Sequence, residues 1–306
     1  MDAMPARPHQ PPASAHKLSE LAARLQSLVP QEGFHATALA DVTLMRVDQS
    51  CEPVAVLQEP AIVLALQGLK RGYLGDEVLS YAAGQGLVVS LPMNFSCDTV
   101  VPGPDQPMLA LQVRVDVETV RELVHRLVDV GLPGPSPASG RAMAVMPLDD
   151  AMLDLVGRLL GALGSRMDAA VLGPQLLREL HYRVLLSPAG GCLRELAQWQ
   201  GRVGAVHRSI ECLRARLDKD WQVAELASEA AMSPSAFHAA FKHVTGQSPM
   251  QYLKAVRLHR ARQLLTQTQR LASDVAFEVG YQSASQFSRD YKRQFGATPS
   301  SARLGA

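Results

Sequence analysis

The sequence has few cysteines and no long hydrophobic run, and each of these absences excludes a class of protein. Its four cysteines, Cys51, Cys97, Cys192 and Cys212, include no Cys-x-x-Cys pair. That spacing excludes a zinc knuckle and argues against a disulfide framework. The longest apolar run, residues 61–66, is far shorter than the roughly 18 to 20 residues that cross a bilayer. The N-terminal stretch, rich in Pro and Ala, lacks the apolar core of an export signal. We therefore expect a cytoplasmic protein without a membrane segment, and a disordered tail over residues 1–17.

The sequence also lacks the common motifs of enzymes and metalloproteins. It contains no glycine-rich phosphate loop, no Gly-x-Ser-x-Gly and no His-Glu-x-x-His. We therefore expect no cofactor, no metal and no catalytic residues.

No charge of one sign dominates, because the formal net charge is +1. The charge is nevertheless unevenly distributed. Residues 206–306 contain 14 Lys and Arg against 8 Asp and Glu, and the rest of the chain contains 16 against 21. A basic end on a nearly neutral chain indicates that only this end meets a polyanion. Charge runs are usually just solvated faces, so a motif is needed to decide.

The first part of the chain, residues 18–116, reads as mainly β. Seven short segments have the composition of strands, and Gly75-Asp76 has the composition of a hairpin turn. The expected strands are 43–48, 61–67, 70–74, 77–81, 87–91, 95–101 and 108–116. Beyond Glu118 the apolar spacing becomes helical, over 120–128, 148–163 and 174–186. The prediction is a small barrel or sandwich followed by helices, over residues 18–190. These helices either pack within their own domain or contact a second copy. A linker is expected over 191–205.

A repeat with an offset of 50 residues occupies the C-terminal part, residues 206–306. Its matched pairs are Phe237 and Phe287, Phe241 and Tyr291, Lys242 and Lys292, Gly246 and Gly296, and Pro249 and Pro299. Each copy reads as a short helix, a turn and a second helix that Ser233 or Ser283 caps. Residues 248–267 read as one long helix between the copies. The prediction is a pair of helix-turn-helix motifs joined by a rigid connector.

The second helix of each copy has two distinct faces. One face is aromatic, and the other has short polar residues that lead to cations. The outward residues are Ser235, His238, Ala239 and Lys242 in the first copy, and Ser285, Ser288, Arg289 and Lys292 in the second. Such a face suits a helix in the major groove, where small side chains allow close approach and cations meet phosphate. A helical interaction domain would explain the inward aromatic residues but not the duplicated outward face.

The C-terminal part resembles the DNA-binding domain of the AraC/XylS family over about 100 residues. The resemblance lies in Ala236-Phe-x-x-x-Phe-Lys-x-x-x-Gly-x-Ser-Pro249 and Val275-Ala-Phe-x-Val-Gly-Tyr-x-Ser-x-Ser-Gln-Phe-Ser-Arg289. It implies two recognition helices in successive major-groove segments. The implied DNA-binding residues are Ser235, His238, Ala239 and Lys242, with Ala284, Ser285, Ser288, Arg289, Lys292 and Arg293. Ala239 stands where many relatives carry a polar or basic residue, which leaves Arg289 as the strongest single reader.

The N-terminal part is similar to the regulatory domain of AraC-type proteins. The similarity lies in segments such as Gly33-Phe34-His35 and Leu87-Val-Val-Ser-Leu-Pro92. It implies a cupin-like barrel that binds an effector or mediates dimerisation. Cupin enzymes hold a metal with several histidines, and this barrel offers only His35, which we interpret as structural. Cys51 and Cys97 are candidates for sensing an oxidant or electrophile, with small buried hydrophobes as the alternative.

Together these patterns predict an α+β protein, with a cupin-like barrel plus helices before an all-α domain. We expect a DNA-binding transcription regulator, with an activator as the favoured role, although the sequence does not fix the sign of regulation. The expected partners are double-stranded promoter DNA, a small-molecule effector, a second copy of the chain and RNA polymerase. Two alternatives stay open: a metal-free barrel enzyme, and a module that binds a partner protein without reading DNA.

Overall fold

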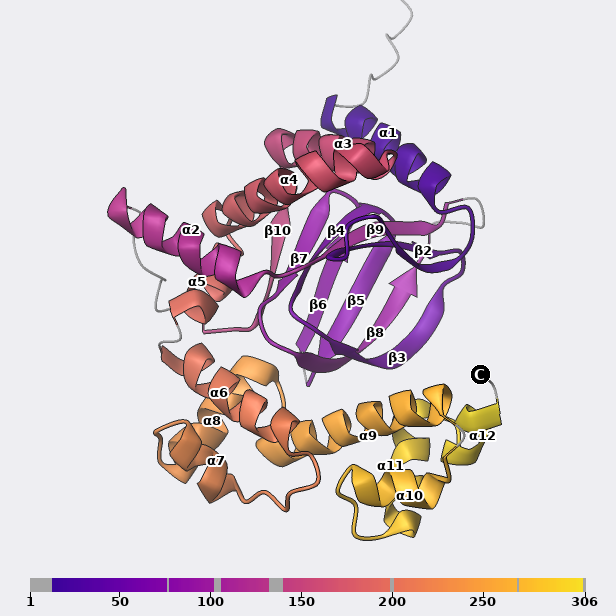
Figure 1. The fold of residues 1–306 in the computed structure, drawn as a ribbon, viewed down its shortest axis with the longest axis vertical. Coiled ribbons are helices and arrows are strands. Elements are labelled where there is room, and N and C mark those ends of the chain that lie inside the picture. The colour runs from indigo at the N-terminus through magenta and orange to yellow at the C-terminus, as the bar shows by residue number, and fades with distance from the viewer. Residues whose placement is uncertain are drawn as a thin grey trace, which may run out of the picture.

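The computed structural model describes residues 13–75, 77–101, 106–131, 140–198, 201–268 and 270–304. A β-rich unit with covering helices is followed by an all-helical unit (Figure 1). This confirms the predicted α+β class and the order of the two architectures. Within the described ranges, no helix is both long and apolar enough to span a membrane.

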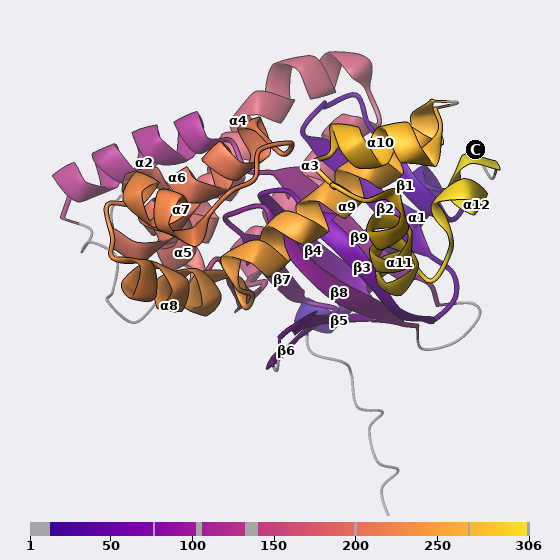
Figure 2. The same ribbon diagram turned by 90° about the horizontal axis from the view of Figure 1, so that it is seen from below.

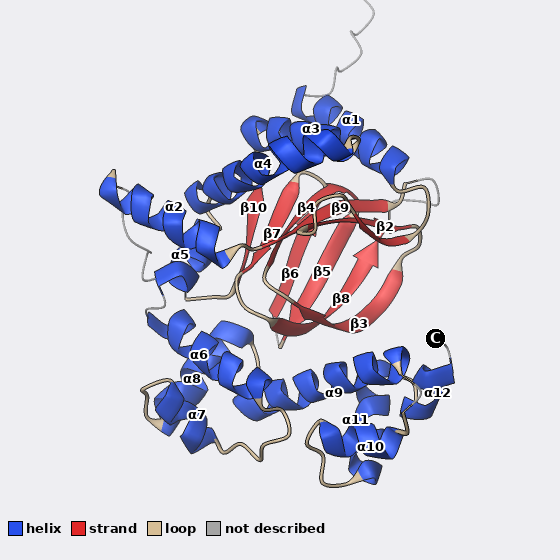
Figure 3. Cartoon of the chain, in the orientation of Figure 1, coloured by secondary structure: helices blue, strands red, loops and turns tan. Residues whose placement is uncertain are grey.

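Two antiparallel sheets face each other and form the flattened barrel that Figure 3 shows in red. The larger sheet has the order β1 (Gly33–Ala36), β2 (Val42–Val47), β9 (Met108–Arg114), β4 (Ala61–Gln67), β7 (Gln85–Val89) and β10 (Met143–Pro147). The smaller sheet has the order β3 (Cys51–Gln58), β8 (Met93–Val100), β5 (Leu69–Leu74) and β6 (Glu77–Ala82). Strand β4 is almost wholly buried because it is central in its sheet and helices cover its outer face.

All seven predicted strands are present, as β2 and β4 to β9, and the β5–β6 hairpin turns at Gly75 with a φ of 62°. The prediction missed β1, β3 and β10. Strand β3 contains Glu52 and Pro53 and lies at a sheet edge, where a proline is tolerated and the side chains stay exposed. Its sequence therefore lacks the alternation that marks a half-buried strand.

In the described part of the chain, five helices accompany the barrel. They are α1 (Ala13–Leu28), α2 (Val117–Asp129), α3 (Asp150–Leu163), α4 (Arg166–Leu186) and α5 (Gly190–Gln198). Helices α1, α3 and α4 lie together over the larger sheet (Figure 1). Residues 13–17, expected in a disordered tail, belong to α1 because Leu21 and Leu25 bury one face of this helix. Residues 1–12 lie outside the described part of the chain.

The expected linker, residues 191–205, is instead mostly helical, because it falls within α5 and the start of α6 (Gly201–Ala215). In α5 the buried side chains Cys192, Leu193 and Leu196 lie on one face of the helix. Packing of this face outweighs the unfavourable helix propensity of the preceding glycines. The C-terminal unit is therefore joined to the barrel helices through packed structure.

The C-terminal unit continues with α7 (Val223–Glu229), α8 (Pro234–Thr245), α9 (Pro249–Gln267), α10 (Ala272–Glu278), α11 (Ala284–Phe295) and α12 (Pro299–Leu304). Helix α9 runs beneath the barrel and connects the two helix-turn-helix motifs (Figure 1). The buried side chains of the first motif belong to one continuous hydrophobic core with the barrel. Those of the second motif form a separate core with the end of α9.

Candidate nucleic-acid interface

The two helix-turn-helix motifs have the same backbone plan. In the first, Ser233 caps α8 by accepting from the Ala236 amide at 3.4 Å, and Gly246 ends the helix with a φ of 73°. In the second, Ser283 caps α11 by accepting from the Gln286 amide at 3.4 Å, and Gly296 also has a φ of 73°. These caps are local in sequence, which is why the repeat predicted both helices well.

The turns between the helices of each motif require a left-handed residue. Gly280 meets this requirement in the second motif with a φ of 91°. The first motif has Ala231 there, with a φ of 55°, and it is the only non-glycine residue of positive φ in the described ranges. A left-handed alanine is strained by roughly 1 kcal/mol relative to glycine. The surrounding packing therefore holds the first turn in place.

The aromatic faces of both helices are buried as predicted. Phe237 packs edge-on against Phe241, whose ring meets Tyr252 of α9 at 5.5 Å between centroids. Phe287 and Tyr291 repeat the arrangement at 5.6 Å in the second motif. Burial raises the pKa of Tyr291. The contact with Tyr252 anchors α8 on the connector helix α9, and a shared core with Leu258 and Ala261 does the same for α11.

The opposite faces are open. Every predicted DNA-binding residue is exposed except Ala284, which is half-buried. Ser288 donates to the Ala284 carbonyl at 2.9 Å, and the Ser285 hydroxyl lies 2.8 Å from that of Ser283. Both hydroxyl oxygens keep lone pairs for an incoming donor. The structure thus presents two similar polar faces of helical spacing.

The cations on these faces differ in their partners. Within the described part of the chain, the side chains of Lys242, Arg289 and Lys292 make no hydrogen bond or ion pair. Arg293 differs, because its Nη2 lies 2.5 Å from Oδ1 of Asp290, a buried carboxylate on the same helix. Asp290 also pairs with Lys254 of α9. Asp290 was not among the predicted site residues, although its charge beside the inward-facing Tyr291 was a signal for it.

The barrel lies close to both recognition helices. A cavity of about 1000 Å³ separates the β5–β6 hairpin from α8, α9 and α11. Predicted DNA-binding residues Ala239, Lys242 and Arg293 line one side of it. Figure 2 shows the hairpin between α8 and α11 when the molecule is viewed from below. Both recognition helices therefore face the barrel as well as solvent.

The hairpin touches α8 at its C-terminal end. A Cβ atom at Gly246 would lie 2.5 Å from Cγ of Leu74, so only glycine fits at this contact. Glu77, near the tip, accepts from Arg141 Nη2 at 2.7 Å. That bond holds the pKa of Glu77 below its ordinary value, with a smaller contribution from His243 of α8. A single carboxylate of the hairpin, Glu77, therefore lies near the C-terminal end of α8 and is paired with Arg141.

A polar clasp, which we define as Asn94, Gln247 and His259, joins strand β8 to α9 and to the turn between α8 and α9. Asn94 donates to the Gln247 side chain at 3.2 Å, and Gln247 returns a bond to the Asn94 backbone carbonyl at 3.1 Å. His259 Nε2 lies 3.2 Å from Asn94 Oδ1. Nearby, the buried Tyr252 hydroxyl donates to the Pro92 carbonyl at 2.9 Å. Sequence patterns gave no signal for these contacts because the partners lie about 160 residues apart.

An exposed ion pair adds to the clasp. Arg214 of α6 donates two bonds to Glu59, at 2.7 and 3.0 Å. The bidentate geometry fixes α6 next to the loop between β3 and β4. The orientation of the helical unit on the barrel is therefore specified by several polar contacts as well as by apolar packing.

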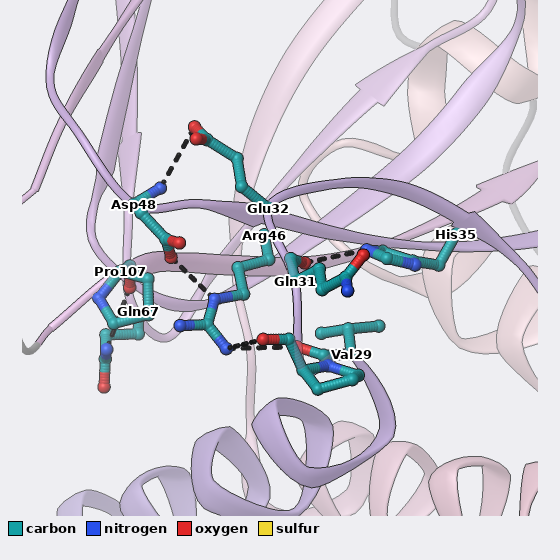
Figure 4. Close-up of polar contacts among 9 residues, drawn as sticks. Val29, Gln31, Glu32, His35, Arg46, Asp48, Gln67 and Pro107 are labelled. Carbon is teal, nitrogen blue, oxygen red and sulfur yellow. Dashed lines mark hydrogen bonds and ion pairs between the residues drawn. The ribbon is translucent and has the colours of Figure 1, made fainter.

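The barrel end near His35 is occupied by internal hydrogen bonds (Figure 4). His35 Nε2 lies 2.8 Å from the Gln31 carbonyl. Arg46 donates to Asp48 at 2.6 Å and to the Val29 carbonyl at 3.2 Å. Among the residues that the structure describes, no group of three or more His, Cys, Asp or Glu could hold a metal ion.

The two candidate sensor cysteines lie on neighbouring strands. Cys51 is exposed on β3, and Cys97 is half-buried on β8. Burial raises the pKa of the Cys97 thiol, and the nearby Lys70 offsets only part of this. Because the thiolate is the reactive form, this environment disfavours reaction at Cys97.

Comparison with protein families agrees with this architecture. Residues 38–192 match the AraC-type transcriptional regulator N-terminus, and residues 226–304 match a helix-turn-helix domain. The chain belongs to the AraC family.

Curated relatives within the AraC family match only part of the chain. The chain is 33% identical over 133 residues to the HTH-type transcriptional regulator ExsA of Pseudomonas aeruginosa, which is 42% of this chain and 46% of ExsA. It is 36% identical over 91 residues to the HTH-type transcriptional regulator AlkR of Acinetobacter baylyi, which is 30% of each protein. The chain thus spans less than half the length of these relatives.

Solved structures with the same fold include ToxT of Vibrio cholerae. A crystal structure of wild-type ToxT bound to an unsaturated fatty acid aligns with a TM-score of 0.58 and 11% identity. The alignment covers 86% of this chain and 94% of that one. A structure of ToxT from Vibrio cholerae O395 gives a TM-score of 0.53 and 9% identity over the same share of this chain. At such low identity, the likeness concerns the fold.

Proposed function

We propose that this chain is a sequence-specific DNA-binding transcription regulator. Residues 206–306 would bind promoter DNA, and residues 18–190 would control that binding. One observation carries the proposal: two recognition helices of the same plan present exposed polar and cationic faces from a single connector helix. The names of the matched AraC-family relatives support it. Such a role would place the protein in the cytoplasm, and it requires no catalytic step.

The test is DNA binding by the full chain as a function of salt. Fragments of its neighbouring promoters should contain a site that binds at least 100-fold more tightly than a scrambled duplex. The logarithm of affinity should fall steeply with the logarithm of salt, because Lys and Arg displace counterions from phosphates. A Lys242→Gln or a Lys292→Gln variant should reduce that slope, and the matched single-charge variant Arg126→Gln on α2 should not. Binding without preference for any duplex would refute the proposal.

We further propose that the effector is an organic anion with an apolar body, bound in the cavity beneath the barrel. Leu79, Phe95 and Met143 give this cavity an apolar wall. Arg141, Lys242, His243, Lys254 and Arg293 surround it with nitrogen donors. The fatty-acid complex of ToxT supports this class of ligand. A ligand that contacts both units stabilises their docked arrangement, and DNA binding should weaken accordingly.

Oleate, used below its micelle concentration, is a suitable probe. It should raise the melting temperature and lower the affinity of the full chain for its preferred site, whereas methyl oleate should do neither. A Leu79→Arg variant, which fills the apolar wall, should abolish both effects while leaving DNA binding intact. Equal effects of oleate and its methyl ester, or no effect of oleate on either quantity, would refute an anionic effector.

The remaining expected partners are a second copy of the chain and RNA polymerase. Helix α4 supports the first, because Met167 and Val171 are exposed one turn apart. A Val171→Asp variant should shift the sedimentation of the chain from dimer to monomer. Transcription by purified RNA polymerase from the preferred promoter, measured with and without the protein, would test the second partner. An increase or a decrease would give the sign of regulation.

A further inference from the structure

Recognition helix α11 carries a buried carboxylate directly beside its strongest predicted reader. The side chain of Asp290, which follows Arg289, is only 7% exposed. Its Oδ1 lies 2.5 Å from Nη2 of Arg293, and its Oδ2 lies 2.8 Å from Nζ of Lys254 on α9. The contact with Lys254 is an ion pair without the direction of a hydrogen bond. Both ion pairs hold a cationic group, that of Lys254 or that of Arg293, next to the buried carboxylate.

The helix-turn-helix fold does not itself require a carboxylate at this position. The repeat places Ala240 of α8 at the position that matches Asp290, and Ala240 is equally buried at 4% exposure. A buried charge costs free energy unless it is paired, and alanine avoids that cost in the same backbone setting. The ion-pair node of Asp290, Lys254 and Arg293 therefore has a role that the first motif lacks.

The node changes the charge that α11 can offer to DNA. Arg293 and Lys254 both line the cavity on the barrel side, and Asp290 compensates part of their charge. Arg289 and Lys292 are left as the unengaged cations of α11 within the described chain. Non-specific affinity grows with the number of phosphates that cations neutralise, whereas base discrimination depends on a few directed contacts. If Arg293 is kept away from phosphate, non-specific affinity falls while base discrimination is retained.

We propose that Asp290 is a specificity-determining residue of the second recognition helix. It retains Arg293 and Lys254 in internal ion pairs. Helix α11 therefore binds phosphate less, and it contributes to DNA binding mainly through Arg289. It acts through these cations and is a positioning residue, since its buried carboxylate is itself turned away from DNA. This inference rests on the proposed DNA-binding function.

The test compares Asp290→Asn with Asp274→Asn in the full chain. Asp274 is exposed on α10 of the same motif, so its variant makes the same change of net charge without touching the node. Affinities for the preferred duplex and a scrambled duplex are measured at several salt concentrations. Asp290→Asn should bind the scrambled duplex about 3- to 10-fold more tightly at low salt, with a salt slope steeper by about one. The ratio of preferred to scrambled affinity should fall, and Asp274→Asn should change it little.

Arg293→Gln makes the test independent of the folding of the Asp290 variant, because the Arg293 side chain is 71% exposed. In the wild-type background, Arg293→Gln should leave the salt slope almost unchanged. In the Asp290→Asn background, it should remove the increase in slope and in affinity for the scrambled duplex. A wild-type slope that drops by a full unit in Arg293→Gln would overturn the inference, as would an unchanged affinity ratio in a folded Asp290→Asn protein. Equal losses on both duplexes with a lower melting temperature would show a purely structural role. If the wild type shows no preferred duplex, the proposed function fails instead.

Discussion

The two helix-turn-helix motifs share one backbone plan but differ in what surrounds them. The first belongs to the same hydrophobic core as the barrel, and its α8 meets the β5–β6 hairpin at Gly246. The second has its own small core, and its recognition helix carries the charges Arg289, Asp290 and Arg293 where α8 has Ala239, Ala240 and His243. The difference indicates a division of labour. Under the proposed function, we infer that the first motif transmits the state of the barrel and that the second contributes most of the base discrimination.

The largest expected effect tests whether the two cores are separable. Phe237→Ala and Phe287→Ala remove matched, fully buried rings, and each should cost about 3 to 5 kcal/mol of the stability of its own core. Phe287→Ala should unfold the second motif alone and leave the barrel transition in place. Phe237→Ala should instead lower the main transition. Calorimetry and hydrogen exchange on the two variants would distinguish these outcomes. A single transition shifted equally by both changes would contradict the division of the core.

The division between the motifs was only partly visible in the sequence. Caps such as Ser233 and Ser283 and the aromatic spacing are local signals, so the sequence predicted both recognition helices and their open faces. The clasp between Asn94 and Gln247 joins residues 153 apart, and no local pattern encodes such a pairing. The ion pairs of Asp290 depend in the same way on how α9 packs against α11. Helix α1 did leave a signal, because Leu18, Leu21, Leu25 and Leu28 have helical spacing, but the Pro-rich start obscured it.

Base discrimination provides the next test of the comparison. Arg289→Ala should weaken binding to the preferred site by about 1 to 3 kcal/mol and relax the sequence requirement at one base pair. Ala239→Ser, at the matching position of α8, should change affinity by much less because the native residue has no polar group to lose. Competition binding against a library of single-base variants would measure both. An equal loss on every sequence would show that Arg289 contacts only phosphate.

The clasp tests whether the barrel restrains the first motif. Gln247→Ala removes two side-chain hydrogen bonds to Asn94, which together contribute about 1 to 2 kcal/mol to the docked arrangement. The full chain should then bind its preferred DNA several-fold more tightly, because undocking exposes the cavity side of α8. As a control, Gln263→Ala on the exposed side of α9 should leave affinity unchanged. Weaker DNA binding in a folded Gln247→Ala protein would show that the docked arrangement is the binding form.

The smallest expected effect concerns pH, and it involves the one clasp residue that also contacts the second motif. Burial lowers the pKa of His259 to about 4, with a smaller contribution from Arg262 on the same helix. Its ring also packs edge-on against Phe295 of α11 at 5.2 Å between centroids. Well above pH 6.5, the ordinary pKa of histidine, the residue is neutral in the folded and unfolded states and contributes no pH dependence. As the pH falls from 6.5 towards 4, the unfolded state takes up a proton that the folded state refuses, so stability is lost in that window.

Between pH 7 and 5.5 this loss should amount to about 1 kcal/mol in the wild type. Melting curves of the wild type and of His259→Gln, which retains a donor for Asn94, would isolate the histidine contribution as the difference between their pH slopes. If His259 links both motifs to the barrel, acid should loosen the clasp and the packing of α11 together, and hydrogen exchange should rise in both. Exchange that rises only around α8 would instead show that the second motif is independent of the clasp, and would sharpen the contrast between the two.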